Sequence, residues 1–475
     1  MTRLPNTRPR RARAARLAAG LATAACLTLA AACSANLTGG DLTDNPNAPS
    51  KASINQELVA VTAISGATLT GDDNRVISIW MRQMAGTGRQ WLTYDGPYVI
   101  DENSFGSFSA FYTGGGLVDI RAVQAKAKAA NDRRYLGVAE VWEALVMGYV
   151  ADWWGDVPYR QAADLAVPKP ALDPQQQVYG DLQKLLDAAI ADLQAGGTGP
   201  GAFDLIYGGD AKKWTALAHT LKARLYLHVA ERDAGAYAQA LANASLGIAD
   251  ASGDFRTYQS STVGEENQWF QFARGRGTDI SGGSYLVTLL STRNAGGLDP
   301  RLTQYFAANG TGKVVGADPG QEGETFSYLS TTRGDPGFRQ PLVTAAENTL
   351  IRAEARLQTG DLAGAAADLN AERATAGLPA VAAGLPRATL YQQIIEEKYV
   401  ALFQNAEVWS DWKRTCWPNF APANGARMIP ARFFYGADER GTNPNIPSPS
   451  QAPRRNWNDP ANATALDGSA CLGQG

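Results

Sequence analysis

Apolar residues recur every three or four positions in several parts of the chain, and the clearest stripe lies between residues 135 and 150. Its members are Tyr135, Val138, Ala139, Trp142, Leu145, Val146, Tyr149 and Val150. This spacing predicts a helix with one buried face. Gly155 and Pro158 interrupt the pattern, because glycine tolerates a positive φ and proline lacks a backbone N–H. We therefore expect the helix to end at a rigid corner that contains Trp153 and Trp154.

Two further stripes, 128 residues apart, predict a pair of related helical hairpins. In the first hairpin, one helix carries Trp214, Leu217, Ala218, Leu221 and Leu225, and the next helix carries a facing stripe of Tyr237, Ala240 and Leu241. In the second hairpin, the first helix carries Leu350, Ala353 and Leu357, and the facing stripe is Leu362, Ala365, Ala366 and Leu369. Both resemble tetratricopeptide units, which are stable only when they stack on their neighbours. Residues 179–193 and 390–403 predict two more helical pairs.

The helical pattern weakens between about residues 253 and 339, where glycine, serine, threonine and aromatic residues take over. Alternation typical of strands is too sparse there for an independent core, so we expect a long loop-rich excursion. The predicted fold class is mainly α, with tetratricopeptide-like hairpins forming an α-α superhelix that carries this excursion.

Residues 1–32 have the composition of a lipoprotein signal peptide. Six arginines without an acid precede an Ala- and Leu-rich run, which is shorter than the roughly 20 residues that span a bilayer. The run ends at Leu29-Ala30-Ala31-Ala32-Cys33, which is similar to a lipobox, and Cys26 is a competing site. Lipidation of Cys33 would leave residues 33–50 as a flexible tether before one folded domain over 51–475.

Charge and cysteine content narrow the function classes. Loss of the six leader arginines changes the formal net charge from −3 to −9, and an acidic chain without a basic run argues against nucleic-acid binding. Cys416 and Cys471 are the cysteines that remain after the leader. An exported protein can keep a disulfide, so these two are either bridged or free.

The sequence contains few residues in the patterns that bind metals or cofactors. His219 and His228 lie nine residues apart on one predicted helix, and at about 100° per residue they fall on opposite faces. The sequence contains no His-Glu-x-x-His segment and no paired Cys-x-x-Cys. We therefore predict no metal site and no cofactor.

The corner after the first helix offers two acids, Asp152 and Asp156, that fit the two carboxylates of a glycosidase. Acids at a helix end and a tight turn more often accept backbone N–H bonds, and we expect that role here. For the aromatic residues of the corner, Trp153, Trp154 and Tyr159, we expect buried packing.

Residues 155–159 read Gly-Asp-Val-Pro-Tyr after an aromatic helix end, and this segment resembles a hallmark of the SusD/RagB family of outer-membrane nutrient-binding lipoproteins. Other segments agree with the family's pattern in the expected order: residues 45–47, 221–227, 352–361, 369–373, 396–403, 409–414 and 429–435, with Asn443 and Asn445. One departure is Asn405-Ala406-Glu407 before Val408-Trp409, where the family usually has Glu-Gly, so the chain is similar to divergent members.

The resemblance implies a SusD-like fold and a surface-exposed lipoprotein, anchored in the outer membrane and facing the cell exterior. Such a protein binds an oligosaccharide or peptide nutrient without catalysis and passes it to a SusC-like TonB-dependent transporter. Ligand contacts are then expected from aromatic rings on loops, which stack on sugar rings while polar neighbours bond the hydroxyls. The candidates are Trp91, Tyr94 and Tyr98, with Phe105 and Phe108 nearby, and Trp269, Phe270 and Arg274, with Phe272 and Arg276 nearby.

Two other functions fit the same sequence. One is a secreted helical glycoside hydrolase with catalytic acids among Asp152, Asp156, Glu265 and Glu266. The other is a tetratricopeptide scaffold of the cell envelope that binds no small ligand.

Overall fold

The computed structural model describes residues 52–459, except residues 105, 106, 234, 295, 420 and 427. The predicted signal peptide, the tether, Cys33, Phe105 and Cys471 lie outside the described residues. Cys416 is buried and disulfide-bonded at the end of α18 (Glu407–Thr415), and its pairing with Cys471 stays a prediction. Among the described residues, no helix has both the length and the apolar composition that crossing a membrane requires.

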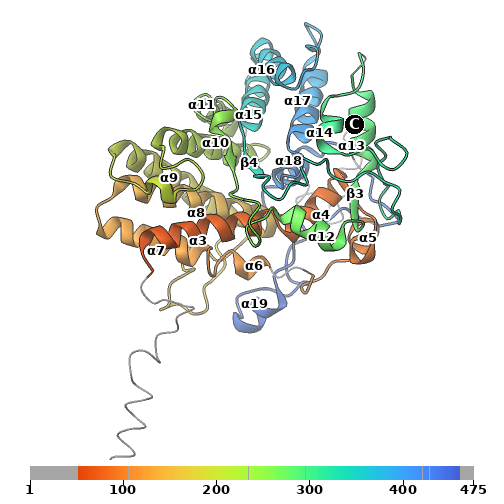
Figure 1. Ribbon diagram of the computed structural model, residues 1–475. Helices are drawn as coiled ribbons and strands as arrows, with labels where there is room; N and C mark the ends of the chain where they lie inside the picture. Colours follow the sequence, from red (N-terminus) through yellow and green to blue (C-terminus); the bar gives the residue numbers. More distant parts are fainter. Residues whose placement is uncertain are drawn as a thin grey trace, which may run out of the picture. The chain divides into compact units, whose positions relative to one another are not determined.

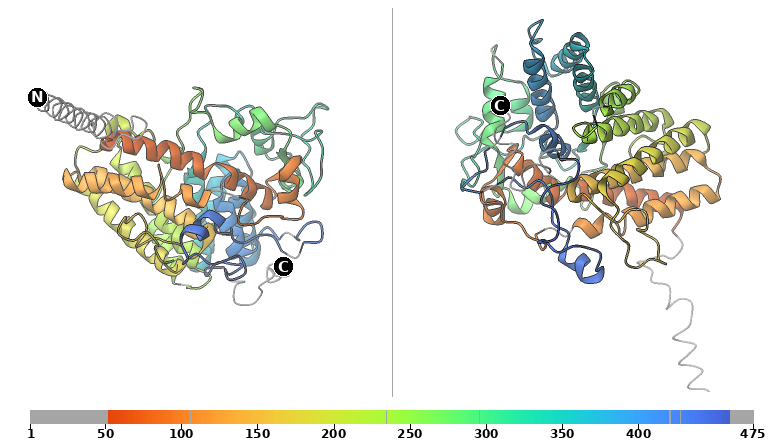
Figure 2. Two further views of the ribbon diagram at one scale, coloured as in Figure 1. Left: turned by 90° about the horizontal axis from the view of Figure 1, so that it is seen from below. Right: turned by 180° about the vertical axis from the view of Figure 1, so that it is seen from behind.

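Helices dominate the described chain, and consecutive helices pack in pairs (Figures 1 and 2). The scaffold helices are α3 (Ile54–Leu69), α7 (Leu117–Ala129), α8 (Arg133–Trp154), α9 (Gln175–Ala195), α10 (Ala211–Val229), α11 (Ala236–Ala244), α15 (Ala345–Gln358), α16 (Leu362–Thr375) and α17 (Arg387–Ala401). The most extensive helix pairs are α8 with α9, α10 with α11, and α15 with α16. The mainly helical architecture confirms the predicted fold class.

The two predicted tetratricopeptide-like hairpins correspond to α10–α11 and α15–α16, and α11 packs directly on α15. Their shared core contains small residues, which let the helices approach closely: Ala223, Ala236, Ala240, Ala244 and Ala355, with Leu227, Tyr237 and Ile351. The second hairpin also closes its own core around Leu350, Leu357 and Leu369. The predicted stripe of α10, from Trp214 to Leu225, belongs instead to the large core that also contains residues of α8 and α9. The stripe of α15 belongs to the core that the second hairpin shares with α17.

Polar side chains begin several of these helices by accepting hydrogen bonds from otherwise unpaired backbone N–H groups. Asp132 accepts from the Tyr135 N–H at 3.0 Å before α8, and Asp210 accepts from the Lys212 N–H at 2.9 Å before α10. Such N-caps contribute about 1 kcal/mol each. Thr344 and Asp361 cap α15 and α16 in the same way.

Helix α8 is buried around its whole circumference, so the prediction of one buried face is wrong. Every residue from Tyr135 to Trp154 is buried, because α7, α9 and α10 pack around the helix and the C-terminal segment covers its end. There the Phe433 N–H donates to the Trp153 carbonyl at 2.9 Å. The predicted helix end is confirmed, since Gly155 follows Trp154 with φ 78°.

The segment around residues 253–339 contains more helix than its sequence indicated. It forms α12 (Gln268–Arg276), α13 (Ser284–Thr292), α14 (Arg301–Tyr305), η2 (Ala251–Gly253), β2 (Phe255–Arg256) and β3 (Ile280–Gly282), joined by irregular stretches. Strand β2 pairs with β4 (Pro341–Val343), and β3 pairs antiparallel with β1 (Met84–Gly86). The β1–β3 pair brings α4 (Asp72–Trp80) and α5 (Arg89–Asp95) beside this excursion (Figure 1). The remaining short helices are α6 (Ser107–Ala110), η1 (Gly201–Phe203) and α19 (Ala437–Thr442).

Candidate functional site

Two aromatic segments that lie far apart in the sequence meet between α5 and α12. The ring centroid of Trp91 lies 5.6 Å from that of Tyr94 and 5.1 Å from that of Phe272, with both pairs nearly perpendicular. The guanidinium carbon of Arg75 lies 4.9 Å from the Phe272 centroid and 5.9 Å from the Trp269 centroid. We call these five residues the aromatic cluster.

The predicted ligand residues of this region lie on short helices and not on loops. Asn267 caps the N-terminus of α12 and so helps this helix to form: its side-chain oxygen accepts a hydrogen bond from the Trp269 N–H at 2.8 Å. Trp91 and Trp269 are each only 2% exposed. Tyr94 and Phe270 are half-buried, and Arg274 is exposed. The two tryptophans are thus the buried members of the cluster, whereas Tyr94 and Phe272 are partly exposed. Phe270 lies on α12 outside the cluster, with the guanidinium carbon of Arg274 5.9 Å from its ring centroid.

Arg75 of the cluster and Arg274, farther along α12, each have a carboxylate partner. Arg75 donates from Nε to Asp72 at 3.1 Å and from Nη1 to the Gln268 carbonyl at 3.0 Å, and burial lowers the pKa of Arg75. Arg274 donates to Glu266 at 2.9 Å. Because Asp72 is 64% exposed, its carboxylate can accept hydrogen bonds from the hydroxyls of a ligand beside the rings.

Tyr98 lies in a separate pocket of about 370 Å³. The pocket wall is mostly apolar, with Ile100, Met428 and Phe434 beside Tyr98, and Arg454 adds a charge. The Tyr98 hydroxyl accepts from the Ala423 N–H at 3.3 Å, and burial raises the pKa of this hydroxyl. The structure therefore places Tyr98 in this pocket and not in the aromatic cluster.

The aromatic corner after α8 has the packing role predicted for it. Trp153 and Trp154 are almost completely buried, and the Trp154 indole donates to the Phe434 carbonyl at 2.8 Å. The Asp156 carboxylate accepts from the Gln175 N–H at 2.8 Å, which holds the start of α9. These contacts fix the path of the chain between α8 and α9.

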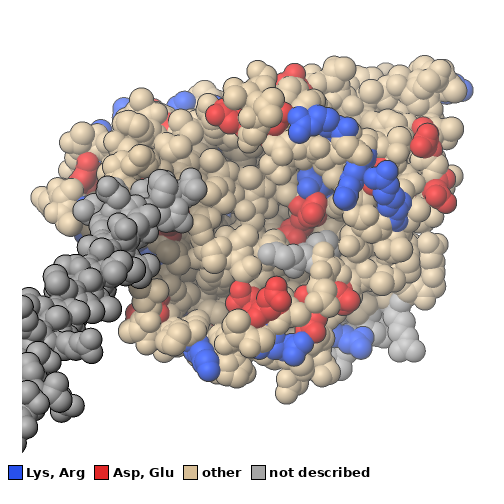
Figure 3. Space-filling model, turned by 60° about the horizontal axis from the view of Figure 1, so that its bottom comes forward, with Lys and Arg blue, Asp and Glu red and all other residues tan. Residues whose placement is uncertain are grey.

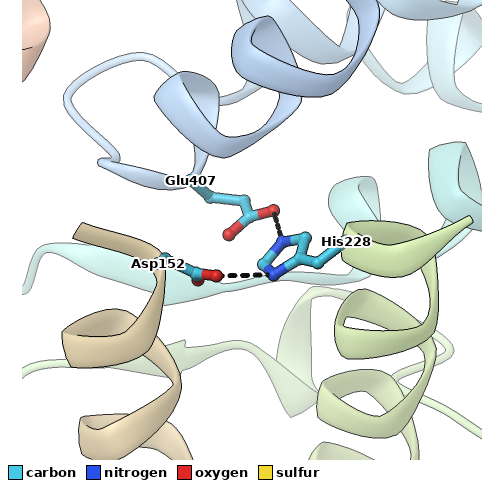
Figure 4. Close-up of side chains that lie close together, drawn as sticks. All are labelled: Asp152, His228 and Glu407. Carbon is cyan, nitrogen blue, oxygen red and sulfur yellow. Dashed lines mark hydrogen bonds and ion pairs between the residues drawn. The ribbon is translucent and has the colours of Figure 1, made fainter. Parts of the chain in front are cut away.

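His228 of α10 lies between two buried carboxylates, a grouping that the sequence analysis missed (Figure 4). Its Nε2 lies 2.7 Å from a Glu407 oxygen, and its Nδ1 lies 2.9 Å from an Asp152 oxygen. Burial lowers the pKa of His228, but the charges of Asp152 and Glu407 outweigh burial and raise the pKa to about 9. His228 is therefore protonated at neutral pH.

The environment of Asp152 corrects the role predicted for this residue. Its carboxylate accepts from the Tyr179 hydroxyl and pairs with His228, instead of accepting backbone N–H bonds. The reason is that α9 and α10 pack against the end of α8 and bring these side chains to it. Asp152 is only 2% exposed, which leaves its carboxylate no access to a substrate.

The same three side chains could also be considered as metal ligands, since their ligand atoms lie within 4.8 Å of one another. Each ring nitrogen of His228, however, faces a different carboxylate, and one metal ion binds only one of these nitrogens (Figure 4). The geometry therefore favours an imidazolium paired with two carboxylates over a metal site.

Charged side chains on the face drawn in Figure 3 lie in small groups, and uncharged residues cover most of the described part of this face. On this part of the surface the basic groups do not form the continuous stripe that is typical of nucleic-acid binding.

Comparison with known proteins gives one family. A model of SusD-like proteins, described as starch-binding and associating with outer membrane, matches residues 46–436. Among curated proteins there is no match.

Several solved structures share the fold. A chitin-binding protein is 20% identical, with a TM-score of 0.69 over 83% of this chain and 95% of the other. A SusD/RagB family protein from Bacteroides thetaiotaomicron is 22% identical, with a TM-score of 0.66 over 89% and 99%. A chitin-binding SusD homologue from Flavobacterium johnsoniae is 18% identical, with a TM-score of 0.71 over 86% and 98%. At such identities the likeness concerns the fold.

Proposed function

Because the chain belongs to the SusD-like family, we propose that it binds an oligosaccharide at the outer membrane and delivers it to a SusC-like TonB-dependent transporter. The family match over residues 46–436 carries this proposal, and the family is described as starch-binding. Two of the similar structures are named for chitin binding, which favours a glycan over a peptide.

The aromatic cluster, together with Phe270, Arg274 and Asp72 on the helices that carry it, supplies the chemistry of a glycan site. The partly accessible rings of Tyr94 and Phe270 offer faces for sugar stacking, and Arg274 and Asp72 offer partners for hydroxyl groups. Trp91 and Trp269 are the buried members of the cluster. Tyr98 contributes through its own pocket of about 370 Å³.

Substitution of the accessible rings tests this site. Tyr94→Ala and Phe270→Ala each remove a stacking surface, so we expect about tenfold weaker binding of maltooligosaccharides or chitooligosaccharides in calorimetric titrations. Tyr226→Ala is the matched control, since Tyr226 is also half-buried but lies on α10. If wild-type protein binds neither series, the proposed function fails.

The proposal includes no catalysis. Asp152 is paired with His228 in the interior, and Asp156 holds the start of α9, so these two acids have structural partners. Incubation of pure protein with starch, chitin and their oligomers should release no new reducing ends. Release that Glu265→Gln or Glu266→Gln abolishes would favour the hydrolase instead.

Delivery to a transporter requires anchoring, and we propose that Cys33 carries the lipid. Two or more acyl chains hold a protein stably on a membrane, whereas one chain of about 0.8 kcal/mol per methylene binds marginally. Cys33→Ser should move the protein from the membrane fraction to the soluble fraction. Recovery of the Cys33→Ser variant in the membrane fraction would contradict the assignment of the anchor. The anchored wild-type protein should also co-purify with a large β-barrel after mild detergent extraction.

A further inference from the structure

A second cavity, of about 330 Å³, lies against α12 and is formed by residues outside the aromatic cluster. One wall is a face of α3, where Val59, Ala63 and Ala67 recur every four residues. The opposite wall is formed by Leu205 and by residues within 258–268. The residues that α3 contributes to the floor of the cavity are therefore small and apolar, and the polar residues of the lining lie within 258–268.

Five polar side chains line this cavity: Tyr258, Gln259, Glu265, Glu266 and Gln268. Gln259 is 8% exposed and its Oε1 accepts from the Thr257 hydroxyl, but its NH₂ group has no hydrogen-bond partner among the described residues. Within the same part of the chain, the Gln268 amide and the Tyr258 hydroxyl also have none. These groups border the cavity and have no protein partner, so they are available to bond a ligand or solvent there.

The tyrosine ring in this cavity is held in place before any ligand arrives. The guanidinium carbon of Arg339 lies 5.8 Å from the Tyr258 centroid. Arg339 in turn donates to the carbonyls of Thr257 and Leu205, each at 2.9 Å. Such preorganisation lowers the entropic cost of binding.

We propose that this cavity is a second sugar subsite, which rests on the proposed glycan binding and extends it. One pyranose ring of a neutral oligosaccharide packs against Tyr258 and the apolar floor from α3. Its hydroxyl or acetamido groups bond Gln259, Gln268 and the Glu265 carboxylate. An aromatic ring with converging amide and carboxylate groups is the combination that recognises sugars.

The cavity and the aromatic cluster lie along the same face of α12. Gln268 lines the cavity and Phe272 packs in the cluster, and four residues along a helix correspond to a rise of about 6 Å. Arg75 of the cluster also donates to the Gln268 carbonyl at 3.0 Å. A ligand of several sugar units can therefore contact both sites, and its affinity should increase with chain length.

Filling the cavity tests this inference without disturbing the core. Ala63 is exposed on α3 and faces the cavity, so Ala63→Trp occupies it, whereas Ala63→Ser at the same position leaves it open. Chitooligosaccharides and maltooligosaccharides of two to six units are titrated into wild type and both variants. We expect Ala63→Trp to weaken binding of the hexasaccharide about tenfold and to flatten the dependence on chain length, with Ala63→Ser unchanged.

Tyr258→Ala provides a second variant, with a thermal unfolding curve as the check on folding. If wild type binds sugars and Tyr94→Ala weakens binding, but Ala63→Trp and Tyr258→Ala do not, the second subsite is overturned and the proposed function stands. If Ala63→Trp blocks binding of a peptide pool and leaves sugar binding intact, the cavity is a peptide site and the inference is also overturned. If wild type binds no sugar, both proposals fail.

Discussion

His228 shows how one residue links three separate parts of the chain. Its two carboxylate partners come from the end of α8 and the start of α18, and all three side chains are buried. Its pKa is about 9 in the folded protein and about 6.5 in an unfolded chain. The pairing therefore stabilises the fold fully below pH 6.5, and this stabilisation is lost as the pH rises through 9.

Replacement of His228 tests this charge. His228→Gln leaves Asp152 and Glu407 buried without their cation, so we expect a loss of about 3–5 kcal/mol in the free energy of unfolding at pH 7. The difference between wild type and variant should shrink between pH 7 and pH 10. Urea unfolding at several pH values measures it.

His219→Gln is the control for this experiment, since His219 is only half-buried and its Nδ1 contacts Asn243 at 3.1 Å. A stability difference for His228→Gln that stays constant up to pH 10 would show that the imidazole is neutral in the folded protein.

The sequence predicted some residues at this corner and missed others for a physical reason. The corner formed by Trp153, Trp154 and Gly155 could be predicted, because its bulky rings and its helix-ending glycine lie next to one another in the sequence. His228 has no such signal, because its partners are set by how α8, α10 and α18 pack. Pairs of this kind become visible only once the tertiary fold is known.

At the scale of the helix, the end of α8 depends on Gly155. Its backbone has φ 78° and ψ −113°, a region that residues with a side chain rarely adopt. A Cβ at this position would also lie 2.9 Å from Oδ1 of Asn456. Strain and crowding therefore act together at this helix end.

Alanine at position 155 should destabilise the protein, whereas alanine inside α9 should not. We expect Gly155→Ala to cost about 1–3 kcal/mol, because the left-handed backbone conformation is unfavourable for alanine. Gly180→Ala is the control, since Gly180 is exposed within α9 with open space around its Cα, and it should add about 0.5–1 kcal/mol of stability. Thermal unfolding of both variants checks the opposite signs, and a neutral Gly155→Ala would contradict the argument.

Helix length decides how much of the fold the sequence could predict. The long scaffold helices repeat their apolar spacing over several turns, as the stripe of α10 does from Trp214 to Leu225. Helix α12 has only nine residues and includes Gly275, so its periodicity is too short to identify. Its remaining signal is Asn267 at the N-cap, which the surrounding turn residues obscure.

For the molecule as a whole, the segments that carried the family resemblance have a structural role. Arg224, from residues 221–227, forms two hydrogen bonds of 2.6 Å each with Glu347 and thereby joins α10 to α15. Arg414, from residues 409–414, pairs with Glu354 and joins α18 to α15. These motifs therefore hold the helical pairs together, which is why they indicate the fold and say little about the ligand.

A double-mutant cycle on Arg224 and Glu347 tests whether this link holds the hairpins together. Arg224→Met and Glu347→Gln each leave a buried group without its partner, so each should cost about 3–5 kcal/mol in urea unfolding. The double variant should cost clearly less than the two together, because neither partner then remains unpaired. Arg160→Met, which breaks the exposed 2.7 Å pair with Asp181, is the control and should change stability little. Additive losses in the cycle would mean that the two side chains act independently, and would contradict the proposed link between α10 and α15.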